Sequence, residues 1–356
     1  MTSPLARQIA RLIEQTGPIP LSQYMALALG HPEHGYYMTR DPLGARGDFV
    51  TAPEISQMFG ELVGLWLADQ WLEQGSPKPF VLAELGPGRG TLMADALRAI
   101  AAVPHMVEAA SIHLVETSPV LRNAQSKRIP QAHWHEHVDD LPDLPLFLVA
   151  NEFFDALPVT QYQRTERGWC ERFVSMAEGR FVPVLAPVPL ADDSGLPAAM
   201  KAAQEGSIAE VSPASTSITE TIAHRIARRG GAALVIDYGH VSSAPGDTLQ
   251  ALRDHKFADP FEAPGEADLT AHVDFEALSH AASAAGAAAH GAVEQGRFLM
   301  ALGIEARAEA LSRNATPAQR EDIASAMQRL TARDGMGSLF KVLGITPRGA
   351  PSPAGF

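Results

Sequence analysis

The sequence predicts an α/β protein built on a mostly parallel, doubly wound sheet. Short apolar runs bounded by proline or glycine alternate with helical segments along the chain, as at 80–85, 111–116 and 146–151. The first run leads into a glycine cluster that opens a helix. Open sheets of this class bind their ligands at such strand ends.

The residues before the first strand, 1–78, are expected to form a helical extension. Apolar spacing predicts helices at 5–16 and 20–29, and Pro53 opens a long helix over 53–74. The stretch Gly47-Asp48-Phe49-Val50-Thr51-Ala52 precedes that helix. Capping by Thr51 explains only part of this stretch.

The core of the sheet is expected in two parts, 79–155 and 232–345. Its strands are predicted at 80–85, 111–116, 133–138, 146–151, 232–237, 287–293 and 339–343. Helices are predicted at 91–102, 119–128, 275–285 and 317–333.

Three further segments depart from this alternation. Residues 156–231 are rich in proline, glycine and alanine, which indicates an inserted subdomain. Residues 240–272 read as a long loop, and long loops are often functional. The tail 346–356 is expected to be disordered.

Composition narrows the class of function. The 356 residues are 46% hydrophobic and carry a formal net charge of -13, which disfavours nucleic acid and anionic membranes as partners. The single cysteine, Cys170, excludes an internal disulfide and a multi-cysteine zinc site. No apolar run is long enough to insert into a membrane, so a cytoplasmic location is expected. His133, His135 and His137 lack further ligands nearby, and we expect no metal site.

The most informative motif is Glu84-Leu85-Gly86-Pro87-Gly88-Arg89-Gly90-Thr91. Glycines allow a sharp turn and close approach of a ligand, and the following helix offers free N–H groups. The spacing of Gly86, Gly88 and Gly90 is not that of dinucleotide binders, and no lysine follows as in phosphate loops. A plain tight turn is the alternative for this loop alone.

An acid at the end of the second strand strengthens the ligand-binding interpretation. Glu116 occupies the position where nucleotide-binding sheets hold ribose hydroxyls. Glu84, the glycine loop and Glu116 together resemble the class I fold of S-adenosylmethionine (SAM)-dependent methyltransferases. The last strand, 339–343, would be the antiparallel seventh strand of that Rossmann-like sheet.

Five segments resemble the MidA family, which comprises bacterial proteins and mitochondrial assembly factors of respiratory complex I. The segments are 47–56, 84–91, 115–119, 151–158 and 268–275, in family order within a match that runs from about residue 5 to 345. The resemblance implies a SAM-dependent protein arginine N-methyltransferase. The mitochondrial target in that family is a core subunit of complex I.

The cofactor site is expected to combine a lid from the N-terminal extension with residues at the strand ends. Its predicted residues are Gly47, Asp48, Phe49, Thr51, Glu84, Gly86, Pro87, Gly88, Gly90, Glu116, Thr117, His135, Glu136 and Asn151. Asp139 and Asp140 are alternatives for the contact to adenine, although a solvated turn explains them equally.

Glu152 and Asp155 are the predicted catalytic acids. Glu152 follows the fourth strand, and a carboxylate there can orient a guanidinium and take up its proton. Related arginine methyltransferases carry a second glutamate about ten residues later, where this chain has none. Asp155, Asp237 and Glu54 are the candidates for that role.

An arginine-containing protein, such as a complex I subunit, is the expected partner, and a homodimer is left open. One alternative is a SAM-binding assembly chaperone with little or no catalysis. Another is a small-molecule methyltransferase. The glycine spacing disfavours an NAD-dependent oxidoreductase.

Overall fold

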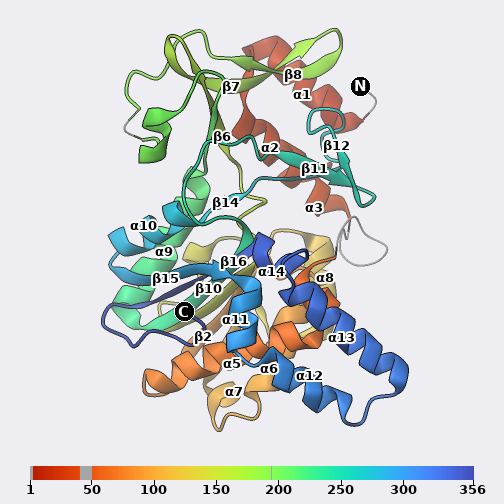
Figure 1. Ribbon diagram of the computed structural model, residues 1–356. Helices are drawn as coiled ribbons and strands as arrows, with labels where there is room; N and C mark the ends of the chain where they lie inside the picture. Colours follow the sequence, from red (N-terminus) through yellow and green to blue (C-terminus); the bar gives the residue numbers. More distant parts are fainter. Residues whose placement is uncertain (1–2, 41–49, 194) are drawn as a thin grey trace.

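The computed structural model describes residues 3–40, 50–193 and 195–356, which form two stacked lobes (Figure 1). We call the lower one the core lobe; it comprises the main sheet and the helices packed on it. The upper one, the cap lobe, comprises 3–39, 156–211 and 249–271. Within the described residues, no helix is both long and apolar enough to cross a membrane.

The main sheet runs in the order β15-β16-β10-β5-β2-β3-β4, with the short β14 pairing the end of β10. Its members are β2 (Phe80–Leu85), β3 (Ala110–Val115), β4 (His133–His135), β5 (Leu146–Asn151), β10 (Gly231–His240), β14 (Val273–Asp274), β15 (Ala287–Glu294) and β16 (Phe340–Pro347). Neighbours from β4 to β10 are parallel, whereas β16 is antiparallel to both β10 and β15. The predicted α/β class is therefore confirmed.

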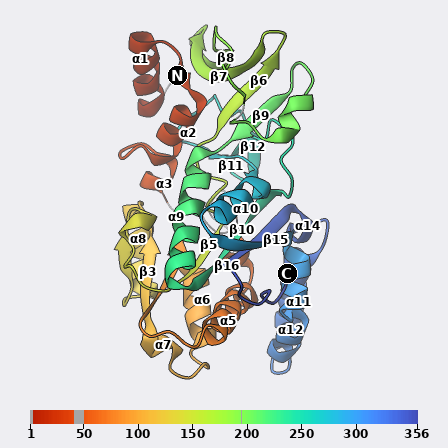
Figure 2. The same cartoon turned by 90° about the vertical axis from the view of Figure 1, so that its left-hand side faces the viewer.

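Helices cover both faces of this sheet because its strands alternate two apolar faces. Phe80 and Leu82 face one core cluster, and Val81 and Ala83 face the other. The first cluster is covered by α5 (Gln57–Glu73) and α6 (Thr91–Ile100), and the second by α9 (Pro213–Arg229) and α10 (Phe275–Ala284). Figure 2 views the molecule from the side of α9 and α10. The short α7 (Met106–Ala109) precedes β3, and α8 (Pro119–Arg128) follows it.

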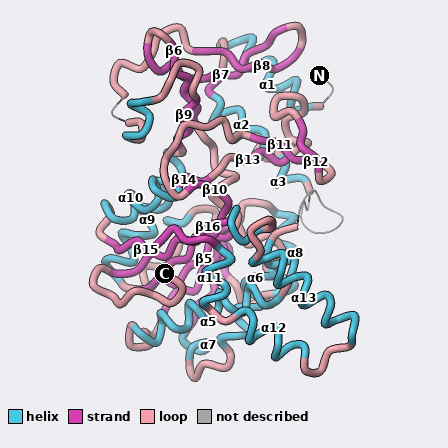
Figure 3. Tube along the Cα trace, in the orientation of Figure 1, coloured by secondary structure: helices cyan, strands magenta, loops and turns pink. Residues whose placement is uncertain are grey.

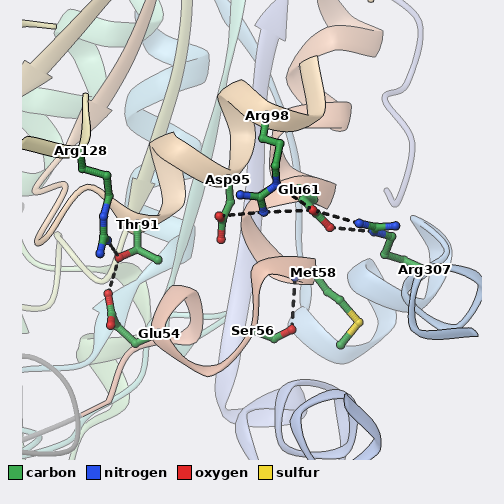
Figure 4. Close-up of polar contacts among 9 residues, drawn as sticks. All are labelled: Glu54, Ser56, Met58, Glu61, Thr91, Asp95, Arg98, Arg128 and Arg307. Atoms are coloured by element: carbon green, nitrogen blue, oxygen red, sulfur yellow. Dashed lines mark hydrogen bonds and ion pairs between the residues drawn. The ribbon is translucent and has the colours of Figure 1, made fainter. Parts of the chain in front are cut away.

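Between β15 and β16 the chain forms four helices rather than the single predicted one. They are α11 (Gln295–Ala301), α12 (Ile304–Ser312), α13 (Pro317–Thr331) and α14 (Met336–Leu339). Glu61 of α5 ties two neighbouring helices to its own (Figure 4). Its carboxylate accepts from Arg98 of α6 at 3.0 Å and from Arg307 of α12 at 2.7 Å.

The cap lobe joins the N-terminal helices to the inserted segment. Its elements are α1 (Pro4–Thr16), β1 (Ile19–Pro20), α2 (Leu21–Gly30), α3 (Tyr36–Thr39), β6 (Thr160–Thr165), β7 (Gly168–Ala177), β8 (Arg180–Leu185), β9 (Ile208–Val211), β11 (Gln250–Arg253), β12 (Lys256–Ala258) and β13 (Asp268–Thr270). The strand β1 pairs with β7, and Ile9, Tyr24, Val174 and Leu269 share one core. Figure 3 shows the strands of this lobe apart from the main sheet.

Three segments differ from the sequence-based expectation. The long helix is broken at Ser56 into α4 (Ala52–Ile55) and α5, and the loop over 240–272 contains the three-stranded sheet β12-β11-β13. The tail is packed rather than disordered. The indole N–H of Trp66 donates to the carbonyl of Ala354, and the ring of Phe356 contacts Trp66.

Candidate active site

A cavity of about 1110 Å³ lies where the carboxyl ends of the parallel strands meet the cap lobe. Its core-lobe wall includes Glu84, Gly86, Pro87, Gly88, Glu116, Thr117, Glu136, Asn151, Glu152, Asp155 and Tyr238. Its cap-lobe wall includes Leu29, Tyr37, Met38, Gln250, Leu252, Phe257, Asp268 and Thr270. Most of the predicted site residues are therefore brought together.

The glycine loop turns tightly at the floor of this cavity. Gly86, Gly88 and Gly90 have φ angles of 58°, 53° and 75°, a region that side chains disfavour. A Cβ on Gly86 would also lie 2.9 Å from the Phe153 ring. The amide of Gln125 donates to the carbonyl of Gly88 at 2.7 Å and fixes the loop.

Two residues of the cavity wall each carry a buried polar atom that has no hydrogen-bond partner among the described residues. The atoms are Oε2 of Glu84 and Oδ1 of Asn151. Burial, together with the nearby carboxylate of Glu116, raises the pKa of Glu84 to about 8. Buried acceptors of this kind call for a donor from a ligand, and a cationic donor would suit Glu84 best. The chain thus fits the ammonium group of SAM, which is a cationic donor.

Glu116 is held at the end of β3 by its neighbours. One carboxylate oxygen accepts from the backbone N–H of Ser118 at 2.8 Å, and the other from Gln125 at 3.2 Å. Burial raises its pKa. The carboxylate is thereby fixed at the cavity wall beside Thr117, where ribose hydroxyls are bound in sheets of this class.

The helix α4 is joined to the start of α6 by the contact between Glu54 and Thr91 (Figure 4). Thr51 lines the cavity and makes no capping hydrogen bond to the helix, contrary to the expectation from its position. Glu54 accepts from the hydroxyl of Thr91, which also contacts Arg128. Glu54 also lines the cavity and lies 3.6 Å from the guanidinium of Arg89 in the glycine loop, so its role as a second acid for the substrate stays a prediction. Gly47, Asp48 and Phe49 lie outside the described residues.

Four residues at the end of β4 and just after it are predicted to contact the cofactor, and only some of them point into the cavity. Glu136 and Asp139 line the cavity. His135 does not: its ring makes a 2.8 Å hydrogen bond to His113, away from the cavity. The selection of His135 is therefore not supported, because alternate residues of a strand point to opposite faces. Asp140 accepts from the backbone of His137 and matches the turn interpretation.

Glu152 and Asp155 belong to the turn that follows the carboxyl end of β5. The carboxylate of Glu152 accepts from the backbone N–H of Ala52 at 3.2 Å and from the amide of Asn151 at 3.0 Å. Burial raises the pKa of Glu152 to about 7, with a further contribution from Asp155. Burial also raises the pKa of Asp155 to about 6. Both side chains line the cavity, so a cationic substrate would find two acids there.

Asp237 supports this turn and does not itself face the cavity. One carboxylate oxygen accepts from the backbone N–H groups of Phe153, Phe154 and Asp155, at 3.0–3.2 Å. Its side chain is fully buried. The suggestion that Asp237 binds the guanidinium is thus not supported, because its oxygens already hold the backbone that carries Asp155. Glu152 itself has a φ of 51°, a strained value of the kind that often occurs at functional sites.

Sequence reasoning missed a further acid at this cavity, on the side of the cap lobe. Asp268 of β13 is buried and accepts from the hydroxyl of Tyr37 at 2.7 Å. Tyr238, near the end of β10, reaches Asp155 and Thr270 with its hydroxyl. The segment 268–275 was noted as a motif, which was the available signal for Asp268. Nothing local in the sequence pointed to Tyr37, 231 residues away.

Comparison with known proteins agrees with this geometry. Residues 62–293 match a family of S-adenosyl-L-methionine-dependent methyltransferases. The chain belongs to this family. A solved structure from Burkholderia thailandensis, a likely methyl transferase bound to S-adenosyl-homocysteine, is 31% identical. The match covers 99% of this chain and 93% of that one with a TM-score of 0.84, which confirms the fold and the class of cofactor.

Curated relatives span nearly the whole chain. A Drosophila melanogaster protein, named protein arginine methyltransferase NDUFAF7 homolog, mitochondrial, is 39% identical over 96% of this chain and 85% of its own length. The Homo sapiens protein of the corresponding name is 37% identical over 97% of this chain and 84% of its own. The MidA resemblance is thereby confirmed. The expected cytoplasmic location is wrong by the same comparison, because these relatives are mitochondrial.

Proposed function

We propose that this SAM-dependent methyltransferase acts on arginine side chains of a protein. The observation that carries the proposal is the pair of cavity-facing carboxyls, Glu152 and Asp155, beside the glycine loop. A planar guanidinium can be bound by carboxylates in a bidentate way, which aims one nitrogen at the reacting carbon. The arginine methyltransferases among the relatives support the same substrate class.

The residues proposed to hold the cofactor follow from their positions. Gly86, Gly88 and Pro87 would form its floor, Glu116 and Thr117 would hold the ribose, and Glu84 and Asn151 would accept from the amino-acid end. The carboxylate of Glu136 or Asp139 would accept a hydrogen bond from the amino group of the adenine. Bound SAM supplies an electrophilic methyl group.

The acids at the end of β5 would orient the guanidinium and remove its proton. Glu152 has a pKa of about 7, near the value that suits proton transfer at neutral pH. The guanidinium nitrogen would attack the methyl carbon as the bond from carbon to sulfur breaks. Glu152 would then take up the proton that the methylated nitrogen loses. Alignment of the two reactants accounts for much of the rate in such displacements.

Labelled methyl transfer tests this proposal. The protein is incubated with methyl-labelled SAM and extract of its own cells, and the labelled protein is hydrolysed to amino acids. Recovery of label in methylarginine supports the proposal, whereas label in another amino acid or in a small molecule contradicts it. A subunit of respiratory complex I is the substrate that the family resemblance favours, and the labelled band identifies or excludes it. Whether the protein works as a homodimer is tested by its mass in solution.

A further inference from the structure

The sheet β12-β11-β13 forms part of the cavity wall and carries a row of side chains across its strands. Phe257 of β12 is opposite Leu252 of β11, and Leu252 is opposite Asp268 of β13. Residues directly opposite in antiparallel strands project from the same face. All three line the cavity, whereas Ala251 and Leu269, from the other face, pack into the cap-lobe core.

The row changes from acidic to apolar as it approaches solvent. Asp268 is 5% exposed, Leu252 is half-buried, and Phe257 is 79% exposed. Phe257 is thus at the mouth of the cavity. Its strand β12 lies on the side of the cap lobe that also carries α3 (Figure 1). Leu339 of the core lobe is 48% exposed and lines the same cavity. Each lobe therefore contributes one exposed apolar side chain to the mouth.

The hairpin that presents Phe257 is already ordered. Asp254 and His255 have φ angles of 51° and 59°, the backbone of a two-residue turn that matches the twist of paired strands. Ala251 behind it is fully buried. A preformed surface loses little conformational freedom when it binds, so the exposed ring can contribute to affinity.

We propose that Phe257, Leu252 and Leu339 form a docking site for a bulky apolar residue of the substrate polypeptide, close to its target arginine. This inference rests on the proposed function, because it places the arginine at the acids deeper in the cavity. Neighbouring strands are about 4.8 Å apart, so Phe257 is roughly 10 Å from Asp268, the acid of this row. Asp268 lines the same cavity as Glu152 and Asp155 and serves as the reference point for the spacing. An extended chain covers that distance in about three residues. Free arginine would leave the apolar part of the row unused.

Designed peptides test the docking site. Each carries one arginine in a glycine–serine background, with leucine or serine placed within about three residues of it. Binding is measured with S-adenosylhomocysteine present, and KM and kcat are measured with SAM. The leucine peptide should bind about tenfold more tightly than the serine peptide. Phe257→Ser should raise KM for the leucine peptide by about tenfold, with kcat and the Kd of SAM unchanged.

A matched control is Val188→Ser, since Val188 is 72% exposed but does not line the cavity. Its KM values should equal those of the unaltered protein. The docking site would be overturned if both peptides bound equally or if neither bound. It would also be overturned if Phe257→Ser changed the KM of both peptides equally. A leucine peptide that binds through Phe257 equally well after its arginine is changed to lysine would leave the docking site in place and contradict the arginine proposal instead.

Discussion

Two groups of buried acids in this protein have opposite surroundings. Glu61, between α5, α6 and α12, is neutralised by Arg98 and Arg307. Glu152 and Asp155, at the cavity, receive hydrogen bonds from backbone N–H groups, an amide and a tyrosine hydroxyl. A buried acid paired with arginine is part of the scaffold, whereas acids that keep raised pKa values can still accept a cation or a proton.

The largest expected effect comes from Glu152→Gln. The amide keeps the shape but cannot take up a proton, so kcat should fall by about 10²- to 10⁴-fold. The Kd of SAM should not rise and the urea midpoint should not fall, because no buried charge loses its partner. Glu178→Gln is the control: Glu178 shares the left-handed backbone, with a φ of 49°, but is exposed on the β7–β8 hairpin. Full activity of the Glu152 variant would show that this acid is not catalytic.

Gly88→Val tests whether the neighbouring loop holds the cofactor. The side chain would strain a backbone with a φ of 53° by about 1–3 kcal/mol. The Kd of SAM, measured by calorimetry, should therefore rise by about ten- to a hundredfold. Gly179→Val carries the same kind of strain at a φ of 75° in an open turn, and its SAM affinity should not change. Equal loss in both variants would point to general destabilisation.

The raised pKa of Glu152 predicts how activity depends on pH. With a pKa of about 7, the carboxyl is protonated and neutral in acid and gains its charge as the pH rises through neutrality. Log kcat/KM should therefore fall by about one for each pH unit below 7. The Kd of SAM is measured over the same range, because Glu84 titrates near 8. A flat profile through neutrality would mean that Glu152 need not be ionised.

The smallest effect is expected at the scaffold acid. Glu61→Ala removes the acceptor shared by two arginines, which are 51% and 36% exposed and can be rehydrated. We expect the free energy of unfolding in urea to fall by about 1–2 kcal/mol, with kcat unchanged at low temperature. Asp143→Ala breaks an exposed pair with Arg229 and should leave the urea midpoint unchanged. If the Glu61 variant lost activity without losing stability, Glu61 would not be a scaffold acid, and the contrast with Glu152 and Asp155 would not hold.

The wall of the cavity that carries the glycine loop and the strand ends could be predicted from the sequence, but much of the cap-lobe wall could not. Glu84, Glu116 and Glu152 follow apolar runs whose parallel pairing brings their ends to one edge. Asp268 and Tyr37 meet only because β13 and the N-terminal helices share the cap-lobe core. Asp237 resembled a site acid because sequence does not reveal which hydrogen bonds a carboxylate already makes.

The hydrogen bond from Ala52 to Glu152 joins two binding events that are usually considered separately. The donor belongs to the segment that lines the cofactor side of the cavity, and the acceptor is the proposed ligand of the arginine. If either ligand changes the strength of that bond, it changes the affinity of the other, and the factor must be the same in both directions. Cofactor and substrate are then coupled through a single shared oxygen atom, and neither affinity is a property of its own site alone.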